Sequence, residues 1–260
     1  MAAAARRPMR AVVLGPGARR ALRGGARGAV ELAFGPGGYV RLDEQRVLLA
    51  PPRSPLGPLS ILVAGLARGD LVPGDPAAVG ADGALVVGPL RIELGAARDW
   101  APPRACALAP QWRAALAAAL EVVAPAPSEL APGLAALAAG DLRDAVAQLA
   151  GRGDGLTPAG DDALAGFAAW RWACDEPVVL PAQRCAPLGR EYLRCAERGE
   201  LPQPAATVLA AIRAGDPQAA ARRARGLADW GASSGAALLW GMAAGAGETV
   251  RGLPRSTSPR

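Results

Sequence analysis

The chain of 260 residues contains no histidine, no lysine and no asparagine. Without histidine, a Ser-His-Asp triad, a Cys-His dyad and every histidine metal site are excluded within this chain. Any general base must therefore be a carboxylate, a cysteine or a tyrosine, or must come from a partner. Aromatic residues are also scarce, at 4% of the chain, which leaves few rings for stacking on nucleic-acid bases.

All 29 basic residues are arginine, and 23 acidic residues leave a net charge of +6. The arginines are scattered, and the one dense run, 222–225, fits the solvated face of a helix better than a nucleic-acid contact. We therefore predict no nucleic-acid partner, although binding to nucleic acid is the third function class that the basic charge raises. A basic surface suits small anionic substrates such as carboxylates or phosphate.

The four cysteines show no Cys-x-x-Cys spacing, which favours reduced thiols in a cytoplasmic protein. They are Cys106, Cys174, Cys185 and Cys195, and the sequence assigns no role to any of them. The apolar piece Ala11–Leu14 is too short for the core of a signal peptide, and no stretch reaches the length of a membrane span. A cytoplasmic location without a membrane partner is the expectation.

The sequence of residues 1–105 predicts a β-rich domain, because short runs of residues that favour β-strands alternate with turns that contain glycine and proline. The predicted strands are 11–14, 29–34, 39–42, 46–49, 60–63, 84–87 and 90–94. The last two are joined through Gly88 and Pro89, which suits a tight hairpin. The segment 56–66 is ambiguous, since a helix over 62–68 is the alternative. Short strands at this spacing predict a small antiparallel barrel or sandwich.

Residues 106–250 predict an all-helical domain, followed by a loose tail over 251–260. The predicted helices are 112–123, 141–150, 163–174, 187–198, 205–214, 217–230 and 235–246. Gly140-Asp141 and Gly215-Asp216-Pro217 are start signals for two of them. The fold class is therefore α+β, with a β-rich N-terminal part followed by helices and a division near residues 100–110.

A glycine-rich loop leads into the predicted helix 163–174, which is apolar nearly all round. The sequence of the loop is Gly151-Arg152-Gly153-Asp154-Gly155-Leu156-Thr157-Pro158. Glycines at alternate positions allow a backbone with positive φ. Thr157 is the predicted N-cap and Pro158 the first helical residue. Asp161 and Asp162 then fall in the first turn, where the helix dipole favours negative charge and an exposed carboxylate contributes about 0.3–1 kcal/mol.

A second copy of this motif follows 75 positions later (235 − 160 = 75), where Ser233-Ser234-Gly235 leads into Leu239 and Gly241. The polar residues are divided between the copies, because the first has the aspartates and the second has the serines. We predict that the two copies meet in space and form one site. The alternative is that both are capped core helices whose similarity reflects packing alone.

The first motif and its second copy resemble the AllH family, whose members are associated with oxamate carbamoyltransferase, a transferase of allantoin catabolism and nitrogen metabolism. The upstream pieces Gly57-Pro58-Leu59-Ser60-Ile61 and Gly88-Pro89-Leu90-Arg91-Ile92 also resemble the family but are less specific. Ala159 stands where the family usually has serine, and Ala237 where it often has aspartate. These two departures imply a changed substrate or a weakened activity.

If the two helix N-termini converge, their free N–H groups and dipoles form an anion site. Asp161 and Asp162 are the predicted catalytic residues, which accept protons or hold an amide. The predicted substrate-binding residues are Arg152, Gly153, Gly155, Thr157, Gly160, Ser233, Ser234 and Gly235. In this hypothesis glycine at 160 and 235 keeps the backbone N–H groups open to the ligand.

No cofactor is expected at this site. A Mg²⁺ ion held by the two aspartates is the alternative, although adjacent helical residues point about 100° apart. The resemblance implies a subunit that acts on a small carboxylate or amide such as oxalurate, oxamate or carbamoyl phosphate, together with other carbamoyltransferase subunits. A non-catalytic anion-binding or scaffold subunit that keeps the family fold is the second hypothesis.

Overall fold

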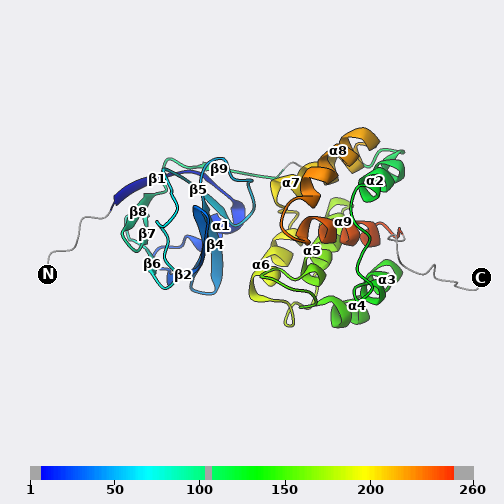
Figure 1. Ribbon diagram of the computed structural model, residues 1–260, viewed down its shortest axis with the longest axis horizontal. Helices are drawn as coiled ribbons and strands as arrows, with labels where there is room; N and C mark the ends of the chain where they lie inside the picture. The colour runs from blue at the N-terminus through cyan, green and yellow to red at the C-terminus, as the bar shows by residue number, and fades with distance from the viewer. Residues whose placement is uncertain (1–6, 103–106, 249–260) are drawn as a thin grey trace, which may run out of the picture. The chain divides into compact units, whose positions relative to one another are not determined.

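The computed structural model describes residues 7–102 and 107–248. The chain divides into two compact units, and the boundary in the sequence lies between Ala101 and Pro102. The first unit is built from strands and the second from helices (Figure 1). The sequence-predicted boundary at 105/106, the thiol of Cys106 and the predicted tail over 251–260 lie outside the described residues.

The first unit is a β-barrel. Its strands follow the order β5-β4-β3-β2-β6-β7-β8-β1, and pairing of β1 with β5 closes the barrel, while β9 pairs with the C-terminal end of β1. The bounds are β1 Arg7–Leu14, β2 Arg27–Phe34, β3 Gly37–Leu42, β4 Gln45–Ala50, β5 Ser60–Ala64, β6 Pro76–Val79, β7 Leu85–Val87, β8 Leu90–Glu93 and β9 Arg98–Asp99. Most neighbours are antiparallel, but β4–β5, β1–β8 and β1–β9 are parallel. The predicted β-rich N-terminal part is thereby confirmed.

Local sequence explains most of this barrel. The β7–β8 hairpin turns at Gly88 and Pro89, as predicted, with Gly88 at φ 50°. The ambiguous segment forms the strand β5 rather than a helix, because Ile61 and Val63 fill the barrel core and are fully buried. Strands β6 and β9 and the short helix α1 (Pro16–Ala21) were not predicted, since each is too short for a clear period.

The second unit contains the helices α2–α9. Their bounds are α2 Trp112–Glu121, α3 Ala131–Ala139, α4 Leu142–Leu149, α5 Ala159–Ala173, α6 Pro187–Ala196, α7 Gln203–Arg213, α8 Pro217–Ala228 and α9 Ser234–Gly245. The predicted helical part is thereby confirmed. Helix α3 was missed because its sequence, rich in alanine, glycine and leucine, is apolar on every side and shows no helical period.

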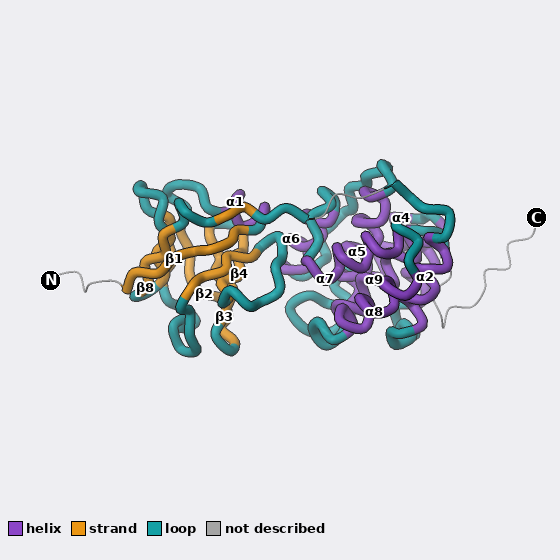
Figure 2. Tube along the Cα trace, turned by 90° about the horizontal axis from the view of Figure 1, so that it is seen from above, coloured by secondary structure: helices purple, strands orange, loops and turns teal. Residues whose placement is uncertain are grey.

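Helices α5 and α9 lie side by side in the middle of the helical unit (Figures 1 and 2). Both are apolar nearly all round, and almost all of their residues are buried. Their bodies touch at glycines: a Cβ at Gly166 would collide with the carbonyl of Leu238, and a Cβ at Gly241 would collide with the carbonyl of Ala163. Close approach of two backbones therefore requires glycine at these two positions.

These contacts give the α5–α9 pair a pseudo-two-fold relationship. A shift of 75 positions carries Ala163 onto Leu238 and Gly166 onto Gly241, so the two glycine contacts are equivalent. Near the end of the pair, Gly245 packs against Trp170, which is again 75 positions earlier. The Gly166–Leu238 and Gly241–Ala163 contacts thus exchange under the shift, and Gly245 meets its own equivalent, Trp170. The helices run parallel, with their N-termini at the same end.

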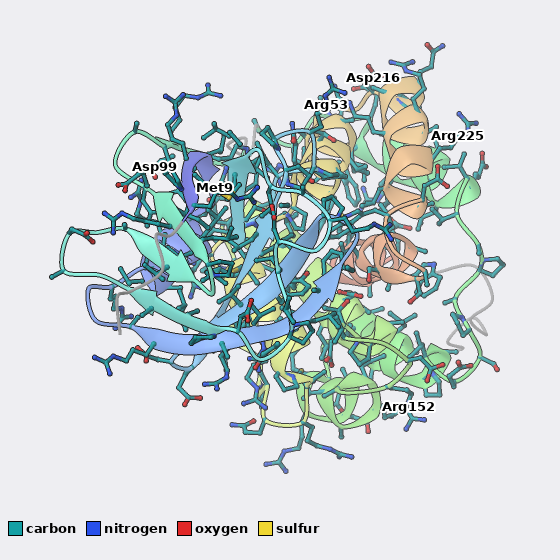
Figure 3. All side chains as sticks on the ribbon, turned by 60° about the vertical axis from the view of Figure 1, so that its left-hand side comes forward. Met9, Arg53, Asp99, Arg152, Asp216 and Arg225 are labelled. Carbon is teal, nitrogen blue, oxygen red and sulfur yellow. The ribbon has the colours of Figure 1, made fainter. Side chains whose placement is uncertain are left out.

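The same shift relates the helices that precede α5 and α9. Gly140 and Gly215 both have positive φ, at 81° and 68°. Asp141 caps α4 by accepting a hydrogen bond from Asp144, and Asp216 caps α8 by accepting one from Ala219. Asp216 lies at the beginning of α8 (Figure 3). The repeat therefore includes the preceding cap and helix, and Ala139-Gly140-Asp141 beside Ala214-Gly215-Asp216 is its sequence signal.

Candidate functional site

The glycine-rich loop before α5 has the backbone that its sequence predicts. Gly151, Gly153 and Gly155 all have positive φ, at 75°, 105° and 92°. The predicted N-cap is wrong by one residue, because α5 begins at Ala159 and Pro158 is its N-cap. The hydroxyl group of Thr157 is instead hydrogen-bonded to side chains of the two motif helices, which makes it part of a polar cluster.

Asp161 is fully buried at the start of α5, and both of its carboxylate oxygens accept backbone hydrogen bonds. The N–H of Gly151 donates to Oδ1 at 2.7 Å, and the N–H of Ala186 donates to Oδ2 at 2.8 Å. Ala186 is the N-cap of α6, so the carboxylate also lies at the positive end of that helix. Asp161 therefore joins the glycine-rich loop to the loop over 181–186.

Asp162 points to a different set of partners. Its side chain is hydrogen-bonded to the hydroxyl groups of Ser234 and Thr157, while its Oδ2 is buried and has no hydrogen-bond partner. Burial raises the pKa of Asp162 to about 7, with a further rise from the charge of Asp161; the two hydroxyl hydrogen bonds act in the opposite direction. The expectation of an exposed first-turn carboxylate was wrong for this residue, which is 5% exposed.

The hydroxyl groups of Thr157 and Ser234 complete a three-residue cluster with Asp162. Their oxygens are 3.2 Å apart, and Thr157 comes from the first motif copy while Ser234 comes from the second. Thr157 and Ser234 are half-buried, whereas Asp162 is buried. The prediction that the two copies meet in space is confirmed by this contact. We refer to Thr157, Asp162 and Ser234 as the hydroxyl–carboxyl cluster.

The structure requires glycine at positions 160 and 235 for a different reason from the one predicted. A Cβ at Gly160 would collide with the carbonyl of Leu149, the last residue of α4, and a Cβ at Gly235 would collide with the carbonyl of Leu227 in the last turn of α8. The N–H of Gly160 already donates to the Arg152 carbonyl. Close packing of the preceding helix, rather than access for a ligand, explains the repeated glycine.

The start of α9 still offers backbone donors. Ser233 is the N-cap but makes no side-chain capping hydrogen bond. Gly235 donates to the Trp230 carbonyl and Ala237 to the Ser233 carbonyl. Among the described residues, the N–H groups of Ser234 and Ala236 donate to no backbone carbonyl, as is usual in the first turn of a helix. They belong to the same helix turn as the Ser234 hydroxyl group.

Arg152 is exposed, and its Nε donates to the Gln148 carbonyl at 2.8 Å. Its side chain lies at the outer edge of the helical unit (Figure 3). Among the described residues, the Arg152 side chain makes no hydrogen bond or ion pair with the hydroxyl–carboxyl cluster. Gly153 and Gly155 are exposed in the same loop, and a role for any of the three in substrate binding stays a prediction.

The two aspartates diverge, as expected for adjacent helical residues, since they bond to separate sets of partners. Within residues 7–102 and 107–248, no group of three or more carboxylate or cysteine side chains could hold a metal ion. Cys174, Cys185 and Cys195 are free thiols. Burial, together with the neighbouring Asp161, raises the pKa of Cys185 to about 12. This thiol therefore stays protonated.

Residues 149–246 match the family model of oxamate carbamoyltransferase subunit AllH. The AllH match begins at the end of α4 and includes both motif copies, so it contains the whole hydroxyl–carboxyl cluster. It confirms the family resemblance for this part of the chain. No curated protein and no solved structure matches the chain. In the part of the chain described, no helix is both long and apolar enough to cross a membrane.

Proposed function

We propose that this chain is a subunit of an oxamate-carbamoyltransferase-like enzyme and that its hydroxyl–carboxyl cluster binds a small carboxylate or amide substrate. The AllH match supports the association with carbamoyl transfer. The observation that carries the binding site is the buried Oδ2 of Asp162, which has no partner although its neighbours come from both motif copies. A buried oxygen without a partner carries a free-energy cost that a ligand N–H would remove.

The donors and acceptors suit a molecule with one amide end and one carboxylate end, such as oxalurate. Ionised Asp162 would accept a hydrogen bond from the amide N–H₂. The N–H groups of Ser234 and Ala236 would donate to a carboxylate or carbonyl oxygen at the start of α9. Because α5 and α9 run parallel with adjacent N-termini, both helix dipoles favour negative charge at this end.

Carbamoyl transfer needs an oriented substrate, stabilisation of a developing oxyanion and removal of a proton. Asp162 fits the proton acceptor, because a carboxyl group with a pKa of about 7 exchanges its proton near neutral pH. In this proposal Asp161 acts by positioning the glycine-rich loop, since both of its oxygens are used by backbone N–H groups. Gly160, Gly235 and Ser233 shape the helix starts around the cluster.

The proposal includes other carbamoyltransferase subunits as partners, a cytoplasmic location and a place in allantoin catabolism. Free thiols at Cys174, Cys185 and Cys195 agree with a reducing compartment. No cofactor is required by the chemistry proposed for the cluster. A magnesium ion at Asp162 would need ligands beyond the described side chains, because Asp161 points elsewhere.

A non-catalytic anion-binding subunit is the second candidate, and one observation favours it. The pseudo-two-fold equivalents of Ser234 and Asp162 are Ala159 and Ala237. Only one of the two equivalent positions therefore carries the polar pair. A subunit that has kept the fold while losing polar groups would show this asymmetry.

The first test is ligand binding measured by thermal shift and calorimetry with oxalurate, oxamate, carbamoyl phosphate and inorganic phosphate. We expect at least one of them to raise the melting temperature of the wild type, because a ligand at 100 times its Kd stabilises the folded state by about 2.7 kcal/mol. Asp162→Asn should weaken this effect at least tenfold in Kd. Asp154→Asn, an exposed carboxylate of the same loop, is the matched control.

If none of the four ligands binds, or if Asp162→Asn binds as well as the wild type, the proposed site is wrong. Carbamoyl transfer by the chain reconstituted with its partner subunits then separates the two candidates. An enzyme subunit loses turnover on Asp162→Asn substitution. A non-catalytic subunit binds the ligand, but the assembly keeps its turnover with the variant.

A further inference from the structure

We propose that the hydroxyl oxygen of Ser234 is the nucleophile that takes the carbamoyl group from a carbamoyl phosphate donor, with Asp162 as its general base. This inference rests on the proposed function and adds a covalent intermediate to it. A nucleophile is recognised by a hydroxyl group in hydrogen-bond contact with a base that a third group orients. The hydroxyl–carboxyl cluster has these three parts.

The contacts give each residue of the cluster a separate role. Ser234 is hydrogen-bonded to the Asp162 carboxyl group and is half-buried. Thr157 contacts both residues, at 3.2 Å from the Ser234 oxygen, and holds the pair in place. Asp162 is buried, and burial raises its pKa to about 7, which suits a group that takes and returns a proton near neutral pH.

The neighbouring serine provides a contrast. Ser233 precedes the helix as its N-cap residue, and its side chain makes no capping hydrogen bond. The N–H groups of Ser234 and Ala236 lie in the same turn as the proposed nucleophile. Donors in this position suit the oxyanion that forms when a hydroxyl oxygen attacks a carbonyl carbon.

In the proposed step the Ser234 oxygen forms a bond to the carbamoyl carbon, and its proton moves to the Asp162 carboxylate. The bond from that carbon to the phosphate oxygen breaks, and phosphate leaves with the electron pair. The product is an O-carbamoyl serine. Attack by the amide nitrogen of oxamate on the carbamoyl carbon would then break the bond to the serine oxygen and release oxalurate. The Asp162 proton returns to the serine oxygen, and the proton that the amide nitrogen loses is taken up by the phosphate released in the first step.

The test is mass spectrometry of the full-length chain after incubation with carbamoyl phosphate and an acid quench. The absence of lysine from the chain removes the usual side chains that cyanate, a breakdown product of the donor, would label. A parallel incubation with cyanate alone identifies labelling of thiols and of the N-terminus. We expect one carbamoyl group on the peptide that contains Ser234, and none at that position with cyanate.

Three variants locate the label. Ser234→Ala should abolish it, and Asp162→Asn should slow its formation at least tenfold. Ser128→Ala is the matched control, an exposed serine of the helical unit outside the cluster, and should keep the wild-type rate. Addition of oxamate to the labelled chain should remove the group and yield oxalurate.

Absence of the label from the wild type, or its persistence in Ser234→Ala, overturns the nucleophile. If carbamoyl phosphate still raises the melting temperature in those samples, and Asp162→Asn removes this shift, the proposed binding function stands and only the covalent step fails. If neither label nor binding is seen for any of the four ligands, both proposals fail together.

Discussion

The hydroxyl oxygens of Thr157 and Ser234 lie 3.2 Å apart, although 77 positions separate the two residues in the chain. Thr157 ends the glycine-rich loop before α5, and Ser234 begins α9. Their contact places the starts of the two parallel helices together above the buried Asp162. The site proposed for this chain therefore depends on a long-range contact that neither motif copy could make alone.

The raised pKa of Asp162 predicts that stability falls as the pH rises. The folded chain keeps a proton on this group up to a pH of about 7, whereas in the unfolded chain the group ionises near its ordinary value of 3.8. Between these values the folded state binds more protons, so its free energy of unfolding decreases by about 1.4 kcal/mol per pH unit. The stabilising contribution of protonated Asp162 is complete below about pH 4 and is lost as the pH passes 7.

Asp162→Asn should remove this dependence, because asparagine does not titrate. Urea unfolding of the wild type and the variant between pH 5 and pH 8 measures the difference, which should shift in favour of the variant as the pH rises. Asp154→Asn serves as the control and should follow the wild type. Parallel pH curves for the wild type and Asp162→Asn would contradict the raised pKa.

Glycines at the α5–α9 contact should not tolerate even a methyl group. Gly166→Ala and Gly241→Ala should each lower the free energy of unfolding by about 1–3 kcal/mol or more, since the added Cβ collides with backbone that cannot easily move. Gly226→Ala in α8 is the control, because nothing lies within 4 Å of its Cβ position. That change should raise stability by about 0.5–1 kcal/mol, and chemical denaturation distinguishes the two outcomes.

Replacement by asparagine should have different effects at Asp161 and at Asp162 on the backbone amides of Gly151 and Ala186. Asp161→Asn turns an amide N–H₂ toward one of the two backbone donors, Gly151 or Ala186, and should cost about 1–3 kcal/mol. Hydrogen exchange of these two amides should become faster. Asp162→Asn leaves both amides protected. Equal protection in the two variants would argue against the positioning role of Asp161.

Pseudo-two-fold symmetry predicts that a second polar pair can be built at Ala159 and Ala237. Ala237→Asp alone buries a carboxyl group at a fully buried position and should be strongly destabilising. Adding Ala159→Ser supplies the equivalent of Ser234 and should recover about 0.5–3 kcal/mol in a double-mutant cycle. Ala159→Ser alone should have little effect on stability. A cycle without coupling would mean that the two positions do not face each other as the symmetry requires.

Much of this architecture could be predicted from the sequence. The β-rich and helical parts, the β7–β8 hairpin and the positive φ values of the motif loop follow from local chemistry, because glycine and proline restrict the backbone wherever they occur. Short elements with weak periodicity, such as α1, β6 and β9, could not be predicted in this way. Their formation depends on pairing and packing rather than on their own residues.

The sequence predicted which residues belong to the candidate site, but it did not predict the contacts between them. The repeat of the motif indicated that Asp162, Thr157 and Ser234 belong together, and the structure shows their contact. The different hydrogen-bond partners of Asp161 and Asp162 could not be predicted from two adjacent aspartates in the sequence, because the partners lie in segments far apart in the chain. The reason for glycine at 160 and 235 likewise depends on where α4 and α8 end.

The spacing of 75 positions between α5 and α9 has a consequence for the ancestry of the helical unit. Consider a chain that contains only one half of the helical unit and pairs with a second copy of itself about a true two-fold axis. Such a homodimer would build the same parallel helix pair, with two identical polar sites. Any change in such a homodimer alters both sites together. Once the halves are joined in one polypeptide, each can change alone, so one polar site can be kept at Asp162 and Ser234 while its equivalent at Ala237 and Ala159 is lost.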